Sequence, residues 1–492
     1  MLDPEFKNID GSTIDLTDGY VVLGSGLSAI ATIHAIIEAS HGNQPKIYVL
    51  DAGINRTSRV QWECGYEIKM PSPKFKNSRG RYVYDYFHSA LGITEKNFFA
   101  IGSLAKGGLS NIWGATIQPY GNEELSAFPY QWDEVRDIYP KIYGILTNES
   151  VGSDAETREE IASCPPSSFR TYSPKLAINK NFSEHGGCEL DSCNVGCISC
   201  NRGVYNSGRE IDYLHRSGKI KYLPGVFVDS AKKIKEFYYL TCKGVSSGEI
   251  FSIRTKNIFS CLGTISTTKI VLNMTKTSAP VPFLTTPGGA FFMFAFRKNN
   301  LGEPNILASQ AFSGNVDGEC FNGNIFSVSE NLMESYFGNP IAKITKYIFG
   351  KWLFSRIFVA NVYFSSDLQK SDIRNGPLGL IIEAGSKRKQ LKLIFRKAMG
   401  LTSKELMKKG LFVLPLSEKL LSPGQDIHYG GTLPMKKNPV KNQCSPTGEL
   451  YGFKGFFIAD SSSMPYLSGK GQSFNSMVNS YYIATKALGN VS

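Results

Sequence analysis

The sequence predicts an α/β fold, and the clearest sign of it lies within residues 19–51. An apolar strand-like run, 19–23, leads into Gly24-Ser-Gly26-Leu-Ser-Ala29 and an apolar-periodic helix over 30–39. A second strand, 46–51, ends in an acid. Two parallel strands joined by a helix predict a βαβ opening. The chain has 492 residues, more than one typical core holds, so we expect two or more domains.

The residue types at this turn suit a bound pyrophosphate. Gly24 permits the tight turn, Gly26 lets the backbone approach the phosphates, and Ala29 lets the helix pack close to the strand. The helix N-terminus offers free N–H groups to the phosphates. Asp51 stands where a carboxylate accepts hydrogen bonds from the adenosine ribose, which favours FAD or NAD over NADP. The alternative is a glycine turn in an ordinary α/β protein.

Composition indicates a globular protein of a reducing compartment. Apolar residues make up 42% and aromatic residues 12% of the chain. The first seven residues include Asp3, Glu5 and Lys7 and lack an apolar stretch, so we expect no signal peptide and a cytoplasmic location. The ten cysteines are therefore not interpreted as a disulfide framework.

Two further segments contain motifs of glycine and polar residues. The first is Gly107-Gly108-Leu-Ser110-Asn111-Ile112-Trp113, in which paired glycines let the backbone lie against a flat ligand. The second lies in the last 67 residues, where His428 stands on a Gly-rich turn, a short strand ends at Asp460, and Asn475 precedes an apolar helix. This order resembles the glucose–methanol–choline (GMC) oxidoreductases, and within them the bacterial branch related to pyranose oxidases.

The resemblance implies bound FAD and assigns roles to the matching residues. His428 would be the general base, Asn475 would hold the substrate oxygen, and Asp460 would bond the ribityl or pyrophosphate part of FAD. Several relatives bond the flavin covalently through a histidine where this chain has Ile112, so non-covalent FAD is expected. The other expected FAD contacts are Gly24, Gly26, Ala29, Asp51, Gly107, Gly108, Ser110, Asn111, Trp113, Val228 (with Val226, near the adenine) and Gly263.

The resemblance also implies a division of the chain. It predicts a Rossmann-like FAD domain of ββα type and a discontinuous substrate domain built on an antiparallel sheet. The expected segments are a first FAD-binding segment (1–125), a cap or first substrate segment (126–187), a second FAD-binding segment with a cysteine-rich loop (188–282), the substrate domain (283–424) and the catalytic C-terminal segment (425–492).

Alcohol oxidation explains why a histidine would stand at this place. The O–H proton must leave while the C–H hydride goes to flavin N5, so a base is needed within hydrogen-bond reach of the hydroxyl. Histidine suits this because its pKa lies near neutral. The plainer interpretation is that His428 only ties a turn together. The substrate would be a sugar, a polyol or another alcohol, and the electron acceptor is left open.

Most of the net charge of +12 lies in one region. Between 341 and 412 the sequence has fifteen basic and four acidic residues, an excess of eleven positive charges. The rest of the chain is near neutral, so nucleic-acid binding is not expected. The segment 341–354 mixes lysines with Trp and Phe, which suits a helix lying on anionic lipid. A solvated face of a core helix, or a site for an anionic substrate, explains the same pattern.

The densest cysteine group is Cys188, Cys193, Cys197 and Cys200. Four thiolates within 13 residues could hold zinc or an iron–sulfur cluster, although the spacing matches neither a ferredoxin run nor a zinc ribbon. A structural or redox-sensitive loop is the alternative. Two other functions therefore stay open beside alcohol oxidation. One is a flavoprotein reductase or isomerase acting on a lipid- or nucleotide-linked sugar, and the other is an electron-transfer flavoprotein at a membrane surface.

Overall fold

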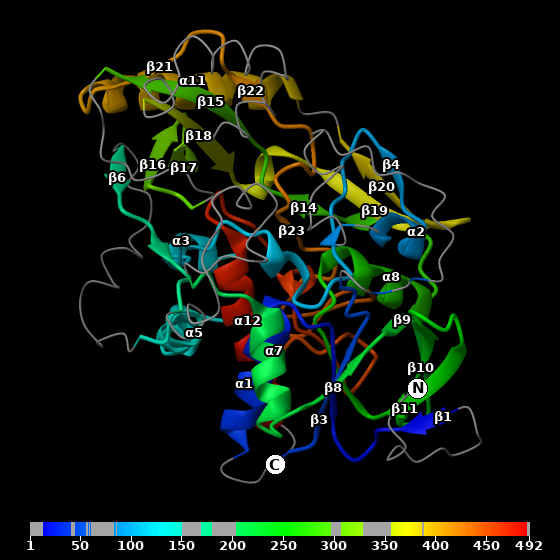
Figure 1. The fold of residues 1–492 in the computed structure, drawn as a ribbon. Coiled ribbons are helices and arrows are strands. Elements are labelled where there is room, and N and C mark those ends of the chain that lie inside the picture. The colour runs from blue at the N-terminus through cyan, green and yellow to red at the C-terminus, as the bar shows by residue number, and fades with distance from the viewer. Residues whose placement is uncertain are drawn as a thin grey trace.

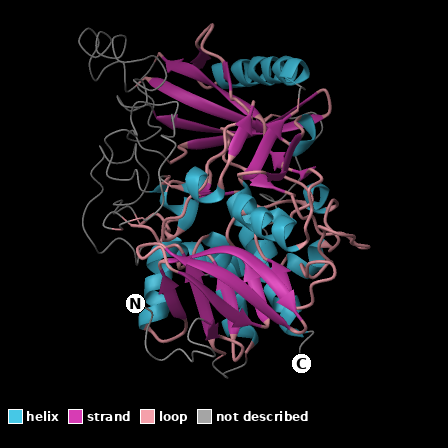
Figure 2. Cartoon of the chain, turned by 90° about the vertical axis from the view of Figure 1, so that its right-hand side faces the viewer, coloured by secondary structure: helices cyan, strands magenta, loops and turns pink. Residues whose placement is uncertain are grey.

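The computed structural model shows a two-lobed molecule (Figure 1). Figure 2 shows the strands gathered in an upper and a lower group, with helices between and above them. The structure describes residues 13–40, 45–55, 58, 60, 83–84, 86–149, 169–179, 203–296, 307–327, 356–385 and 388–489. The cysteine group at 188–200 and the segment 341–354 lie outside the described residues, so the predictions made for them stay predictions.

A five-stranded parallel sheet forms the centre of the lower lobe. Its order is β24 (Phe456–Ile458), β12 (Asn257–Ser260), β2 (Tyr20–Leu23), β3 (Ile47–Asp51) and β8 (Lys221–Pro224). All four pairings are parallel, and Val22 lies between Phe259 and Val49. The sheet thus joins strands from the beginning, middle and end of the chain, as the α/β prediction requires.

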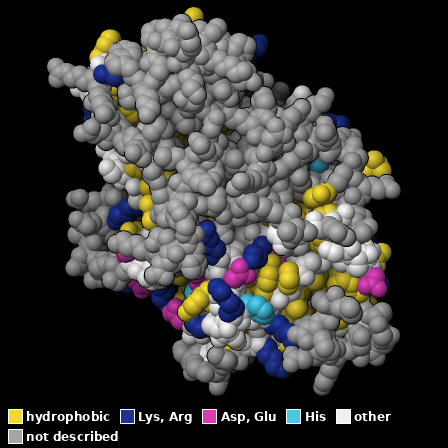
Figure 3. Space-filling model, in the orientation of Figure 1, with side chains coloured by type: hydrophobic (Ala, Val, Ile, Leu, Met, Phe, Trp, Pro, Cys, Tyr) yellow, Lys and Arg dark blue, Asp and Glu magenta, His cyan; other side chains and the backbone are white. Residues whose placement is uncertain are grey.

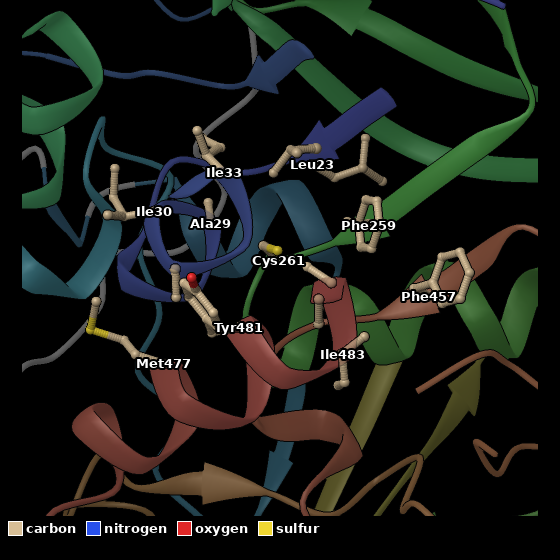
Figure 4. Packing of buried hydrophobic residues seen from close by; sticks show 14 of the residues in the cluster. Leu23, Ala29, Ile30, Ile33, Phe259, Cys261, Phe457, Met477, Tyr481 and Ile483 are labelled. Atoms are coloured by element: carbon tan, nitrogen blue, oxygen red, sulfur yellow. The ribbon is translucent and has the colours of Figure 1, made fainter. Parts of the chain in front are cut away.

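Two long helices from opposite ends of the chain pack together against this sheet. They are α1 (Leu27–Ala39) and α12 (Gln472–Gly489). Figure 4 shows Ala29 on the side of α1 that faces Tyr481 of α12. Ala29 is fully buried, and a larger residue there would separate helix and sheet. The helices α8 (Thr264–Met274), α7 (Ser207–Arg216) and α5 (Ile138–Thr147) complete this lobe.

A second sheet flanks the first one in the lower lobe. It has the order β1 (Thr13–Asp15), β11 (Ile250–Thr255), β10 (Phe237–Gly244) and β9 (Val226–Ile234), and only the β1–β11 pair is parallel. The first residues of β9, Val226 to Val228, are buried beside α8. On the face seen in Figure 3, basic and acidic side chains are interspersed over this lobe.

The upper lobe is built on a seven-stranded antiparallel sheet. Its path is β21 (Leu411–Val413), β15 (Gly288–Ala295), β18 (Ile357–Phe364), β17 (Glu319–Ser327), β16 (Gln310–Val316) and β6 (Arg170–Tyr172), with β22 (Lys419–Leu420) also paired to β15. The strand pairings in this sheet are antiparallel, which confirms the expected antiparallel sheet beside the α/β domain.

One amphipathic helix, α11 (Arg388–Met407), covers this sheet. Its buried residues Leu391, Phe395 and Ala398 pack on the sheet, while lysines and arginines occupy the outer side. Lys397 pairs with Asp317 at 2.6 Å. Among the helices that the structure describes, none is long and apolar enough to cross a membrane.

Smaller elements connect the two lobes. A four-stranded sheet has the order β13 (Val281–Pro282), β19 (Ser371–Gly376), β20 (Gly379–Ala384) and β4 (Thr94–Lys96). The short strand β14 (Leu284–Thr285) pairs with β23 (Tyr429–Gly430), which brings the start of the upper sheet against the histidine turn. Other short elements are α2 (Phe87–Leu91), η3 (Gly108–Asn111), β5 (Thr116–Ile117), α3 (Asn122–Leu125), α4 (Trp132–Val135), β7 (Lys175–Leu176), η7 (Ser366–Leu368) and η8 (Ser461–Ser463).

Candidate active site

A cavity opens where the turns at the carboxyl ends of the parallel strands meet. Its walls are the 24–28 turn after β2, the end of β3 at Asp51, the 101–105 and 108–110 loop, the start of β9 at 226–228 and the 261–266 turn after β12. Asp460, Ser461 and the first turn of α12 close it. This edge is where open α/β sheets bind their ligands.

The two glycines of the first turn have different roles. Gly24 has φ +95°, and a Cβ on it would lie 2.7 Å from the carbonyl oxygen of Cys261, so only glycine fits. Gly26 is extended (φ −74°, ψ −175°), and a Cβ there would meet no atom within 4 Å. Gly26 therefore faces open cavity, as a glycine does when a ligand has to approach the backbone.

Ser25 connects this turn to two other walls, although no sequence pattern singled it out. Its hydroxyl donates to Asp51 Oδ2 at 2.5 Å and accepts from the Gly107 amide at 2.8 Å. Tyr222 donates to the same carboxylate oxygen at 2.9 Å. Burial raises the pKa of Asp51 to about 6 against these hydrogen bonds. Further donors, such as ribose hydroxyls, would stabilise the ionised form.

The 107–113 segment lies partly against the cavity and partly behind it. Gly108 and Ser110 line the cavity. Gly107 (φ +86°) makes the turn, and the Asn111 amide donates to the carbonyl of Gly108 at 2.8 Å. Trp113 donates through Nε1 to the carbonyl of Tyr205 at 2.9 Å and packs against the core. Of the five residues predicted here, two therefore stand at the cavity and three hold the loop.

The turn after β12 lies beside the first glycine turn. Gly263 (φ +82°) would place a Cβ in open space, and its amide donates to Asp460 Oδ2 at 3.0 Å. Asp460 also accepts from Thr267 and from the amide and hydroxyl of Ser462. These bonds use the acceptor sites of the carboxylate inside the protein. Asp460 thus ties two cavity-lining turns together, while Val226 and Val228 line the adjacent wall.

His428 lies on the loop before β23, with its ring against Tyr363 of the upper sheet. The two ring centroids are 5.2 Å apart at 61°. Nδ1 lies 2.7 Å from Thr286 Oγ1, and no hydrogen-bond partner of Nε2 is recorded among the described residues. Burial lowers the pKa of His428 to about 4, so the ring is neutral at pH 7. Its neighbour Tyr429 lines the cavity, whereas His428 lies just beyond that lining.

Asn475 is not among the residues that line the cavity, and its contact with a substrate oxygen stays a prediction. Its Oδ1 accepts from the Tyr120 amide at 2.8 Å and from the Tyr139 hydroxyl at 3.3 Å. Its Nδ2 donates to the carbonyls of Gln118 at 2.9 Å and Gly471 at 3.1 Å. The side chain is 3% exposed and fully bonded, and it fastens α12 to the 118–120 segment.

Replacing Asn475 by Ala is therefore expected to destabilise the fold. The buried amide of Tyr120 and the carbonyl of Gln118 would lose their partners, which we expect to cost about 2–4 kcal/mol. Urea-induced unfolding measures this loss. Asn273→Ala, at an exposed position on α8, is the matched control and should change stability by less than ~0.5 kcal/mol. A loss for Asn475→Ala no larger than that of the control would contradict the assignment.

The first turn of α12 supplies the polar groups that Asn475 does not. Gln472, Ser473 and Ser476 line the cavity, and Gln472 Oε1 is buried with no hydrogen-bond partner among the described residues. Gln472 was missed from the sequence because the helix was expected to start after Asn475. Gly471 and Ser473 mark an earlier start, since glycine and serine favour helix N-termini.

Comparison with solved structures finds the same fold in two oxidases. Pyridoxine 4-oxidase from Mesorbium loti matches with a TM-score of 0.59 and 13% identity, over 95% of this chain and 98% of that one. Formate oxidase from Aspergillus oryzae RIB40 matches with a TM-score of 0.62 and 13% identity, over 98% and 99%. The likeness shows a shared fold, which confirms the fold class that the sequence resemblance implies. No protein-family model and no curated protein sequence matches the chain.

Proposed function

We propose that this protein is an FAD-dependent oxidoreductase that oxidises a CH–OH group of a sugar, a polyol or another alcohol. The observation that carries the proposal is a neutral histidine, with Nε2 unbonded among the described residues, beside a cavity whose glycine turns leave room for a dinucleotide. The two oxidases of the same fold act, by their names, on pyridoxine and formate. They support an oxidase-type reaction and leave the substrate open.

The residues present fit FAD. Cβ atoms at Gly26 and Gly263 would occupy the open space that a cofactor needs, and α1 directs its N-terminus toward the same turn. Asp51 would accept from the ribose, and Val226 and Val228 would border the adenine. FAD, when bound, supplies the hydride acceptor. Because Ile112 offers no nucleophile, acid precipitation should release the flavin into the supernatant.

His428 would take the hydroxyl proton of the substrate on Nε2. Burial keeps the ring neutral, so one of its two nitrogens carries the lone pair that the reaction needs. Tyr363 packs on the ring and limits its rotation. In this proposal Gln472, at the N-terminus of α12, hydrogen-bonds the substrate oxygen or the group beside it. The sequence resemblance assigns this hydrogen bond to Asn475.

Replacing Gln472 by Leu is expected to lower the second-order rate constant for flavin reduction about tenfold. The loss of one hydrogen bond in a desolvated site accounts for this magnitude. Stopped-flow absorbance under anaerobic conditions measures it. Thr485→Ala changes an exposed position of the same helix outside the cavity lining, so it should stay within about twofold of the wild type. Equal effects of both substitutions would remove Gln472 from this role.

The visible absorbance spectrum tests the proposed function. Purified protein incubated with FAD and desalted should keep an oxidised flavin spectrum. A panel of alcohols, polyols and sugars, added without oxygen, should contain at least one compound that bleaches it. A protein that retains no FAD would contradict the proposal, as would a flavin that no alcohol in the panel reduces.

Contact with an anionic membrane is a separate proposal for the basic region. On the described part of that region, the outer side of α11 carries Lys389, Lys392 and Arg396 around Leu393 (57% exposed), and Met407 (50% exposed) ends the same helix. Lysines beside exposed apolar side chains suit the surface of anionic lipid. Flotation with phosphatidylserine vesicles should recover the protein at low salt, and Lys389→Glu/Lys392→Glu should reduce the recovery. Equal recovery with neutral vesicles would contradict an electrostatic contact.

A further inference from the structure

We propose that Thr286 and Asp426 select the tautomer of His428, holding the ring proton on Nδ1 so that Nε2 is left unprotonated. This inference rests on the proposed function, in which Nε2 receives the substrate proton. It assigns Thr286 and Asp426 as positioning residues, which act on the reaction through His428 alone.

The three side chains form one continuous hydrogen-bonded row. Thr286 Oγ1 lies 2.7 Å from His428 Nδ1 and 3.2 Å from Asp426 Oδ2. Thr286 is fully buried and Asp426 is 7% exposed, so water does not compete freely for these contacts. The β14–β23 pairing, with Thr285 opposite Tyr429, fixes the two chain segments against each other.

The proton count in this row decides the tautomer. A threonine hydroxyl has one proton, and it can donate either to Asp426 or to His428. If it donates to Asp426, Nδ1 must carry a proton and donate to Thr286 Oγ1, and Nε2 keeps its lone pair. If it donates to Nδ1, the proton of the neutral ring lies on Nε2, and the ring is not a base toward the cavity.

Asp426 favours the first arrangement because its Oδ2 is held as an acceptor. The Thr286 amide donates to Oδ2 at 2.9 Å and the His428 amide donates to it at 3.3 Å. Burial raises the pKa of Asp426 to about 7, so a fraction of the carboxyl groups is protonated at neutral pH. Two amide protons already point at Oδ2, so an added proton belongs on Oδ1. Oδ2 then still accepts from the Thr286 hydroxyl.

The ring nitrogen shifts of His428 report the tautomer directly. With ¹⁵N-histidine label, the six histidines give a small set of two-bond ¹H–¹⁵N correlations, and His428→Gln identifies the signals of His428. The wild type, measured without substrate, should show a protonated Nδ1 and an unprotonated Nε2. The opposite pattern in the wild type would overturn the proposal without any variant.

Two substitutions of Thr286 separate the effect of its hydroxyl group from the effect of its side-chain volume. Thr286→Val keeps the shape and removes the hydroxyl, so the His428 shifts should move toward an Nε2-protonated or mixed state. Flavin reduction should slow about 10–100-fold, as expected when part of a general base is lost. Thr286→Ser keeps the hydroxyl, and both readouts should remain close to the wild type. Unchanged His428 shifts in Thr286→Val would overturn the proposal.

Asp426 is tested by a conservative and a disruptive substitution. Asp426→Asn can place its amide oxygen where Oδ2 lies, so the tautomer should persist. Asp426→Ala removes the acceptor, and the tautomer should change. If Asp426→Ala leaves the His428 shifts as in the wild type, Asp426 has no part in the selection. Because the shifts are read without turnover, a flavin that no alcohol reduces refutes the proposed function and leaves the shift result standing.

Discussion

Replacing His428 by Ala is expected to slow reduction of the bound flavin by ~10²–10⁴-fold, the contribution typical of a general base. The substituted protein would still bind FAD, because His428 lies beyond the residues that line the cavity. Neither Tyr363 nor Thr286 beside it is suited to take the hydroxyl proton at this place. Anaerobic stopped-flow absorbance, with the alcohol that reduces the wild type best, measures the rate.

His215→Ala is the matched control for this prediction. His215 lies on α7, where its Nδ1 is 3.3 Å from the carbonyl oxygen of Ile220, outside the cavity lining. Its substitution should change the reduction rate by less than about twofold. A His428→Ala protein that reduces its flavin at the wild-type rate would remove His428 from the role of base, and the cavity would need another proton acceptor.

Replacing Gly26 by Val is expected to raise the Kd for FAD by at least ~10²-fold, roughly 2.7 kcal/mol. The backbone at Gly26 is extended and accepts any residue, and a Cβ there meets no protein atom within 4 Å. The substituted protein should therefore fold. The added side chain would fill the space between the turn and a pyrophosphate, which the helix N-terminus could then no longer reach.

Flavin fluorescence during titration with FAD measures this loss, and thermal unfolding of the FAD-free protein measures folding. Gly400→Ala is the control, because a Cβ at this exposed α11 position also meets no atom within 4 Å. It should leave both quantities unchanged. Undiminished affinity in Gly26→Val would show that the pyrophosphate does not lie over this turn. A parallel loss of folding would show that Gly26 is a structural residue.

The features of the site that are local in sequence could be predicted from sequence. The turn from Gly24 to Ala29 and the acid at Asp51 belong to one βαβ unit, where strand, turn and helix lie within about thirty residues. The conformation of Gly24 follows from its own steric freedom. The antiparallel architecture of the upper sheet could also be predicted. The motifs near the two ends of the chain carry the family resemblance, and that resemblance implies an antiparallel sheet in the middle of the chain.

The features that depend on distant segments could not be predicted. Thr286 lies 142 residues before His428, and no local pattern connects them. Asn475 was assigned from its residue type and order alone, although its amide is bonded to a segment 355 residues earlier in the chain. The start of α12 lies four residues earlier than expected, at Gln472 in place of 476, and this puts Gln472 at the cavity. Helix boundaries are the feature that sequence patterns place least well.

The measurement that tests the central claim most directly is the stoichiometry of a single anaerobic turnover. The FAD-loaded protein is mixed with an excess of a reducing alcohol, and bleached flavin and newly formed carbonyl product are counted in the same sample. We predict one carbonyl compound for each flavin reduced, with His428→Ala reaching the same ratio far more slowly. Flavin reduction without a carbonyl product would contradict the account.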